Sequence, residues 1–259
     1  MKVACGSLEF AWARLCARHG QRVIETSWRR IEHARALAPT LALARASALR
    51  PWLVGITAES APAQMEATLR GHWRAHVAEI EGWLPLPWQA AVAWCALLPA
   101  LPALQHVARG GAAPAWLADE FGVGVGVGLN AELNTTKGIA SNHDAAGSEL
   151  LRLVKPAPCA GAAWVERWRE LLPAPERAQS GLLAQLVLTL QAHGAAFSAA
   201  PASQGWPQRA DLRARLMRLY RNATLAPAAI FIHLALTALD VERLRAELLR
   251  RAWFELRVA

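Results

Sequence analysis

The chain has 259 residues, a formal net charge of +8, and 12 Trp beside one Tyr and five Phe. A chain of this length can bury a large core, either as one long domain or as two smaller ones. Apolar residues make up 54% of it, and much of that fraction is Ala, a strong helix former that is only mildly apolar. Alternating, strand-like stretches are hard to find. The composition therefore predicts an all-α fold, arranged as a multi-helix orthogonal bundle or a funnel-like helical array.

The positive charge comes almost entirely from Arg, because Lys2, Lys137 and Lys155 are the only lysines. The planar Arg side chain binds phosphate and carboxylate groups bidentately, which makes nucleic-acid binding one alternative function. However, the basic residues are scattered along the predicted helices and are often paired with acids, as Glu247 is with Arg250. No aromatic-interleaved motif accompanies them. The Ala, Arg, Pro and Trp usage also fits a GC-rich coding sequence, so we do not expect a nucleic-acid partner.

The cysteines argue against both a structural zinc site and a disulfide framework, because they are far apart and form no CxxC pair. They are Cys5, Cys16, Cys95 and Cys159. Near the N-terminus, Glu9 and Arg14 fall where a signal peptide needs an unbroken apolar core. We therefore expect a reducing, cytoplasmic setting, with peripheral membrane association through partners.

Residues 1–120 are predicted to form an N-terminal helical region. A helix is expected over 8–19, followed by Gly20 as its C-terminal cap. Ile24, Trp28 and Ile31 then follow the four-then-three spacing of one helical face. These elements predict a run of amphipathic helices.

Two further helices are expected in this region. The first covers 41–49 and stops at Pro51, with Pro39 tolerated in its first turn. The second starts near Pro62 and carries a long apolar stripe at steps of three and four residues. The stripe consists of Met65, Leu69, Trp73, Val77, Ile80 and Leu84.

Residues 82–108 contain no Asp, Glu, Lys or Arg, and the stretch is long enough to span a bilayer. It also contains Pro85, Pro87, Pro99 and Pro102. Each proline removes an amide donor and clashes with the preceding turn. We therefore interpret the stretch as a buried helix pair, 88–98 and 102–109, and keep a spanning helix as the alternative.

Residues 121–158 differ from the rest of the chain in composition. Three of the four Asn and two of the three Lys fall here, and glycines alternate with valines from Gly122 to Gly128. Glycine is costly in any regular element. We predict a flexible insertion or linker, and a local reading-frame error is the alternative explanation of the unusual composition.

Residues 159–259 are predicted to form a C-terminal helical region, which could also continue the first region as one domain. Helices are expected over 164–172 and 180–193, followed by a Gly/Ala/Ser/Pro loop over 194–207. Asp211 is expected to cap a helix over 212–222.

The last helix, 227–254, is the clearest element. Its first half is apolar nearly all round and should be buried. Its second half places charges opposite a single apolar stripe, which consists of Val241, Leu244, Leu248 and Ala252.

One pattern could bind a metal ion. His72 and His76 lie four residues apart on one helix face, with Glu79 about one turn further on. Two His at this spacing can ligate a metal. The residues between them include no general-base Glu, and both His flank the apolar stripe of their helix. They are therefore weak metal-site candidates, and boundary positions of the helix are the simpler interpretation.

Other patterns give no site. The alternating glycines lack the spacing of a dinucleotide-binding loop, and no Gly-Lys-Ser/Thr follows them. No Gly-x-Ser-x-Gly elbow is present. Cys95 lies in an apolar helix and should be an inert, buried thiol. Most Trp residues occupy helix-core or helix-end positions, so packing is their expected role. We predict no catalytic residue and no cofactor.

Three segments resemble the C (or d) subunit family of V-type ATPases and ATP synthases, an all-helical, non-catalytic family of the rotor stalk. Residues 10–14, Phe-Ala-Trp-Ala-Arg, resemble its helix openings. Residues 94–109 are similar to an aromatic-rich element in which Leu104 and Arg109 take matching places. Residues 240–245 are similar to its closing helix. The likeness covers about half of the chain and implies a protein that bridges a rotor shaft and a membrane ring.

The sequence favours a non-catalytic structural or coupling subunit of a larger assembly. Trp and Arg are favoured in interface hot spots, and no active-site motif is present. Other protein subunits are the expected partners. A helical metal-dependent enzyme using His72, His76 and Glu79 is one alternative, and an Arg-rich nucleic-acid-binding protein is the other.

Overall fold

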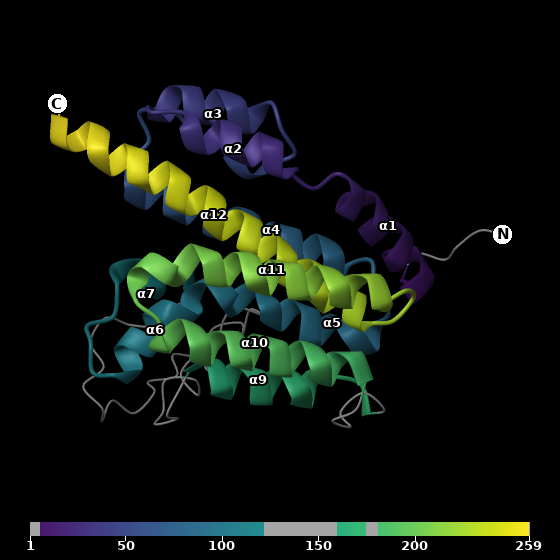
Figure 1. Cartoon of the computed structure of the whole chain (residues 1–259). Coiled ribbons are helices and arrows are strands. Elements are labelled where there is room, and N and C mark those ends of the chain that lie inside the picture. Colours follow the sequence, from purple (N-terminus) through teal and green to yellow (C-terminus); the bar gives the residue numbers. More distant parts are fainter. Residues whose placement is uncertain (1–5, 122–159, 175–180, 259) are drawn as a thin grey trace, which may run out of the picture. The chain divides into compact units, whose positions relative to one another are not determined.

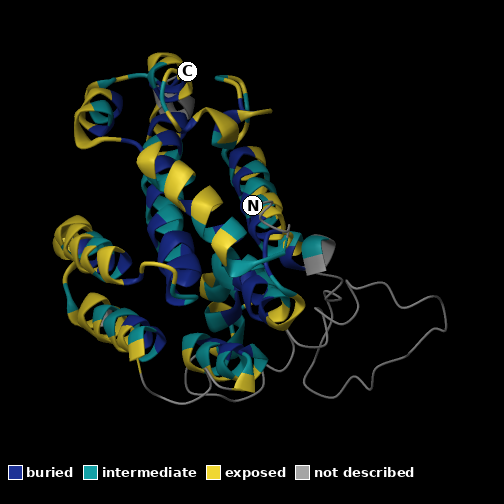
Figure 2. Ribbon diagram, turned by 90° about the vertical axis from the view of Figure 1, so that its right-hand side faces the viewer, coloured by how far each residue is buried: buried dark blue, intermediate teal, exposed yellow. Residues whose placement is uncertain are grey.

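The computed structural model describes residues 6–121, 160–174 and 181–258, and these residues form helices and no strand. This confirms the all-α prediction. Nearly all of the predicted insertion over 121–158 lies outside the described residues. Figure 1 shows the helices along the chain, and Figure 2 shows that they carry distinct buried and exposed faces.

Within the ranges 6–121 and 181–258, the helices follow one another with short connections. In chain order they are α1 Leu8–Gly20, α2 Glu25–His33, α3 Leu37–Arg45, η1 Arg50–Leu53, α4 Pro62–Glu81, α5 Leu86–Ala93, η2 Trp94–Ala100, α6 Leu101–Ala108, α7 Ala115–Phe121, α9 Ala160–Leu171, α10 Gly181–Ala199, η4 Ala202–Gln204, α11 Gly205–Asn222 and α12 Ala228–Val258.

The chain divides into two compact units. One consists of Met1–Ala96 together with Leu172–Ala259, and the other consists of Leu97–Leu171. This division differs from the predicted regions 1–120 and 159–259, because the last helix packs against the first ones and so joins the two ends of the chain in one unit.

Helix α12 is the longest element of the first unit, with 31 residues and a length of about 46 Å. It contacts α1, α3, α4, α10 and α11. Its first half is largely buried, as its apolar sequence predicts. In its second half Leu244, Leu248 and Ala252 join Trp28, Ile31 and Met65 in one hydrophobic cluster. The cluster therefore ties the C-terminal helix to the N-terminal ones.

The predicted apolar stripe is confirmed within α4, and all of its members are buried, although Leu84 follows the end of the helix at Glu81. They are Met65, Leu69, Trp73, Val77, Ile80 and Leu84. The predicted start near Pro62 is also confirmed, since Pro62 is the first residue of the helix, where its missing amide hydrogen leaves no partner unpaired.

Two N-terminal predictions are corrected. Ile24 is not on the buried face of α2: it precedes the helix in extended conformation and is 65% exposed. The helix predicted over 41–49 ends at Arg45 instead. The Ser47 hydroxyl donates to the Ala44 carbonyl at 2.7 Å and accepts from the Leu49 amide at 3.2 Å. These side-chain bonds replace backbone bonds of the helix.

The prediction of a loop over 194–207 is wrong for most of these residues. Helix α10 continues to Ala199 and α11 already begins at Gly205. Asp211 is consequently inside α11, where it pairs with Arg215 at 2.7 Å, and it does not cap the helix. The small residues that suggested a loop are compatible with helix because α10 and α11 pack against each other.

The uncharged stretch 82–108 forms short pieces, α5, η2 and α6, with Pro99 inside the 3-10 turn. The prolines therefore divide it, as expected, although into three elements instead of two. Within the described residues, Leu86–Ala108 is long and apolar enough to cross a bilayer, and 39% of its most apolar window is buried. Core helices of soluble proteins pass the same test, so this stretch does not assign a membrane span.

The second unit contains α6, α7 and α9. The Gln105 side-chain oxygen accepts a hydrogen bond of 2.7 Å from the amide of Ala160, the first residue of α9. This bond satisfies one of the free amides at the helix start. Trp164 and Trp168 are stacked one turn apart on α9, and both are buried.

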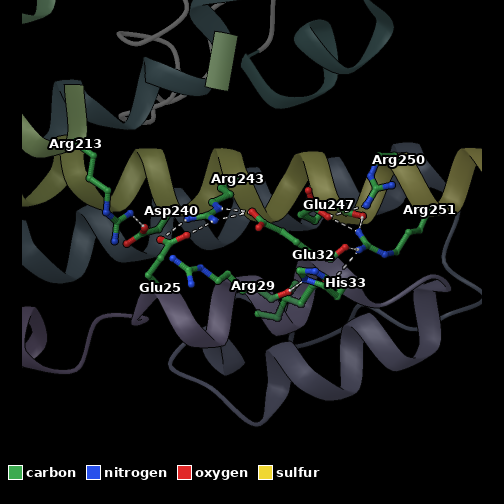
Figure 3. A network of polar contacts seen from close by, with 11 residues as sticks. Glu25, Arg29, Glu32, His33, Arg213, Asp240, Arg243, Glu247, Arg250 and Arg251 are labelled. Carbon is green, nitrogen blue, oxygen red and sulfur yellow. Dashed lines mark hydrogen bonds and ion pairs between the residues drawn. The ribbon is translucent and has the colours of Figure 1, made fainter. Parts of the chain in front are cut away.

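The polar framework of the first unit centres on Arg251 of α12, which is 2% exposed. Its guanidinium donates to the carbonyls of Ile31 at 2.9 Å, Glu32 at 3.0 Å and Ala34 at 2.8 Å. Figure 3 shows Arg251 beside Glu32 and Glu247. The Arg251 guanidinium also donates to the backbone and carboxylate oxygens of Glu247. All five guanidinium hydrogens thus have acceptors, and the C-terminal end of α2 is capped by a side chain of α12.

Two further charged residues of α12 extend this framework. Arg243 binds the carboxylates of Glu25 and Glu32 at 2.9 and 2.6 Å and lies over the Trp28 ring at 4.6 Å. These acids raise the pKa of Arg243 despite its partial burial, so it stays charged. Arg245 binds Glu66 of α4. The charged face of α12 therefore faces carboxylates of other helices (Figure 3).

Replacing Arg251 with Met should destabilise the fold by about 3 kcal/mol, because buried carbonyls of α2 lose their donor. Urea unfolding measures this loss. The matched control is Arg250→Met, which removes an exposed partner of the same Glu247 and should change stability by less than about 0.5 kcal/mol. Equal effects of the two substitutions would contradict the capping role.

Candidate functional site

A cavity of about 450 Å³ lies within the first unit, between α1, α4 and α12 and the segments that follow α1 and α3. Its volume falls in the range of small-molecule sites. Its polar lining residues are Arg18, Gln21, Arg22, His72, His76, Glu79, His233, Thr237 and Asp240. We call it the His–Arg cavity.

Helical spacing places these side chains together. His72, His76 and Glu79 are four and three residues apart on α4, and His233, Thr237 and Asp240 repeat this spacing on α12. Each set therefore lies on one face of its helix, and the two faces meet at the cavity.

Each carboxylate of the cavity is shared by two arginines. Asp240 binds Arg22 at 2.6 Å and also binds Arg213 of α11, and its side chain is 9% exposed. Glu79 binds Arg18 at 2.5 Å and lies 3.9 Å from Arg14. Four guanidinium groups thus face two carboxylates, which leaves an excess of positive charge beside the cavity.

The hydrogen bond of His76 fixes its tautomer. Arg18 lies 3.1 Å from Nδ1 of His76, and because a guanidinium only donates, Nδ1 is the acceptor. In the neutral ring the hydrogen is therefore on Nε2, which is buried and has no hydrogen-bond partner within the described parts of the chain. Burial, together with the positive charge of Arg18, lowers the pKa of His76 to about 4.

His233 is the most isolated polar group of the cavity. It is 2% exposed, and neither ring nitrogen has a hydrogen-bond partner among residues 6–121, 160–174 and 181–258. Its ring lies 6.0 Å from that of His76. Burial, followed by the neighbouring His76 and Arg22, lowers its pKa well below the ordinary value, so the ring is neutral. Two neutral imidazoles with unsatisfied nitrogens therefore lie beside the guanidinium groups of Arg18 and Arg22.

The weak metal-site candidates His72, His76 and Glu79 are engaged in other interactions. His72 Nε2 lies 2.9 Å from the Val54 carbonyl, so this nitrogen carries a proton, while His76 Nδ1 and Glu79 are engaged by Arg18. In the described part of the chain, no group of three or more His, Cys, Asp or Glu residues could hold a metal ion.

The remaining sequence-based sites are placed as follows. Cys95 is buried, its thiol lies 3.6 Å from the Ala91 carbonyl, and burial raises its pKa, so it is an inert thiol as predicted. The glycine repeat 122–128 lies outside the described residues. Trp28, Trp73 and Trp94 are core residues as expected, whereas Trp253 is 57% exposed.

Sequence reasoning found one side of the cavity and missed the other. His72, His76 and Glu79 stood out as a pair of His with an acid, but His233 did not. The signal that could have found His233 is that it is a polar residue in the apolar first half of its helix, between Ile232 and Leu234. Such a residue is buried with its helix and needs a polar partner.

A second surface feature combines aromatic rings and arginine. Arg209 of α11 lies 4.6 Å from the ring centre of Phe197 and 4.9 Å from that of Trp206. Phe197 and Trp206 are 37% and 44% exposed. We call these three residues the aromatic–arginine cluster.

Comparison with protein-family models, curated proteins and solved structures finds no match. The resemblance to the rotor-stalk family thus rests on the sequence alone. Of its three segments, residues 10–14 lie in α1, residues 94–109 cover η2 and α6, and residues 240–245 lie in α12, where Asp240 and Arg243 belong to the polar framework.

The neutral His76 predicts a pH dependence of stability. An unfolded His takes up a proton near pH 6.5, whereas folded His76 does so only near pH 4. The contribution of His76 to the free energy of unfolding is therefore fully present above pH 6.5. It is lost as the pH falls towards 4, which lowers the free energy of unfolding by roughly 3 kcal/mol. Urea unfolding across this window should show a smaller loss for His76→Gln than for the unchanged protein.

The control for this measurement is His33→Gln, which removes an exposed imidazole from the end of α2. It should reproduce the pH profile of the unchanged protein. A His76→Gln variant with the unchanged profile would show that the pKa of His76 is not lowered in the folded protein.

Proposed function

We propose that the protein is a non-catalytic helical subunit that structures or couples a larger assembly. The observation that carries this proposal is the aromatic–arginine cluster, which exposes two large rings beside the partly buried guanidinium of Arg209. Trp and Arg dominate the binding energy of protein interfaces, and aromatic residues are enriched there.

The polar framework supports the same function. Arg22, Arg243, Arg245 and Arg251 bind carboxylates or carbonyls of other elements inside the first unit. Those guanidinium groups thus hold helices together. They do not form an exposed basic surface of the kind that binds the phosphates of a nucleic acid. A helical unit locked in this way can transmit force or position between partners.

The narrower proposal is a C/d-type subunit of the central stalk of a rotary V-type ATPase. It rests on the resemblance of the three sequence segments described above. In this role the protein would be located in the cytoplasm at the surface of a membrane-bound complex and would have other protein subunits as partners.

Affinity capture tests the general proposal. The tagged protein should recover a stoichiometric set of partners from gently solubilised host cells, identified by mass spectrometry. Trp206→Ala should reduce recovery at least tenfold, because a hot-spot residue contributes more than about 1.4 kcal/mol. The matched control is Leu188→Ala, which removes another exposed apolar side chain from α10 and should leave recovery unchanged.

The outcome also separates the two levels of the proposal. Rotary ATPase subunits among the partners would support the narrower form, and a different assembly would contradict it. A stable monomer that recovers no stoichiometric partner would contradict both.

A further inference from the structure

The His–Arg cavity contains unsatisfied hydrogen-bonding groups that the fold itself does not use. His76 Nε2 is a donor without an acceptor, and both nitrogens of His233 lack partners within the described residues. Buried polar atoms of this kind are rare, because each one has lost its hydrogen bonds to water without gaining a partner in the protein. Both residues line a space large enough for a small molecule. This arrangement is expected where a ligand supplies the missing partners.

The charge around the cavity indicates the sign of that ligand. Arg18 and Arg22 line the cavity, and their carboxylate partners Glu79 and Asp240 are each shared with one more arginine. Within the described parts of the chain, the hydrogen-bond acceptor of Arg22 Nη1 is the Met217 sulfur, at 3.8 Å. A thioether is a weak acceptor, so this nitrogen keeps hydrogen-bonding capacity for an oxygen anion.

We propose that the His–Arg cavity binds a small molecule through an anionic oxygen group, a phosphate or a carboxylate, and takes up a proton as it does so. The anion accepts from His76 Nε2 and from the guanidinium groups of Arg18 and Arg22. The proton binds to His233. This activity is independent of the proposed role as an assembly subunit.

His233 is the site of the proton because His76 cannot gain one without losing its bond from Arg18, which requires a free electron pair on Nδ1. His233 makes no such bond, and protonation gives it a second donor for the anion. The groups that influence it are the cations Arg18, Arg22 and Arg213, the acids Glu79 and Asp240, and the imidazoles of His19 and His76. A bound anion offsets the cations, which otherwise keep the ring neutral.

Isothermal titration with sodium sulfate tests the proposal, since sulfate keeps its charge over the pH range used. The titration is repeated in two buffers of different ionisation enthalpy, which reports the number of protons bound. We expect saturable binding with uptake of about one proton, and an affinity that increases by up to tenfold for each pH unit from about pH 7.5 to 5.5. Absence of saturable binding across this range would overturn the proposal.

The decisive variant is His233→Gln, which keeps a polar side chain but cannot become charged. It should bind sulfate at least tenfold more weakly at the lower pH and without proton uptake. His193→Gln is the matched control, because His193 is a partly buried imidazole of α10 outside this cavity, and it should bind as the unchanged protein does. Proton-coupled binding that survives in His233→Gln would overturn the assignment.

A measurement on the unchanged protein covers the case in which His233→Gln does not fold. In ¹⁵N-histidine spectra, sulfate should shift the ring signals of His76 and His233 and leave that of His193 in place. Shifts confined to other histidines would overturn the proposal. Parallel titrations with inorganic phosphate, succinate and vesicles containing phosphatidic acid distinguish a phosphate from a carboxylate, and a free ligand from a lipid headgroup.

Discussion

The contact between Arg251 and the end of α2 is the constraint on which the rest of the first unit depends. Helix α2 has nine residues, and only Trp28 and Ile31 within it are buried. A helix this short is unstable by itself in water. Its last carbonyls are satisfied by Arg251, and its acids bind Arg243. The N-terminal helices are therefore stable only while α12 is in place.

The same helix builds the His–Arg cavity. Asp240 of α12 fixes Arg22 in the segment after α1, and His233, two turns earlier, faces His76 of α4. The cavity therefore exists only when the two ends of the chain have come together. Because burial lowers the pKa of both imidazoles, we expect them to reduce stability at acid pH, which is the kind of local penalty that binding sites carry. Binding of an anion would offset this penalty.

The sequence was informative wherever one helix buried one clear face. The stripe of α4 and both halves of α12 follow from periodicity alone, because their apolar spacing matches the helical repeat. The boundaries of α10 and α11 do not, since Gly194, Gly205 and Asp211 have low intrinsic helix propensity and are held in helices by packing. Ile24 was misplaced because it continues the spacing of a helix that starts one residue later.

Only one side of the His–Arg cavity could be predicted from the sequence. His72, His76 and Glu79 are close in sequence, so their shared face could be inferred. His233, Arg22 and Asp240 join them only through tertiary contacts, which local patterns do not encode. The sequence likewise placed the charges of α12 opposite its apolar stripe, but it did not reveal that Arg243 and Arg251 bind groups of α2. Long-range ion pairs were therefore the main feature that the sequence alone did not reveal.

Native-state hydrogen exchange tests the dependence of the N-terminal helices on α12 most directly. The amides of α2 and those of α12 around Arg243 and Arg251 should open with the same free energy, because neither segment has its partners without the other. Exchange of α2 at a clearly lower free energy, with α12 still protected, would contradict the account.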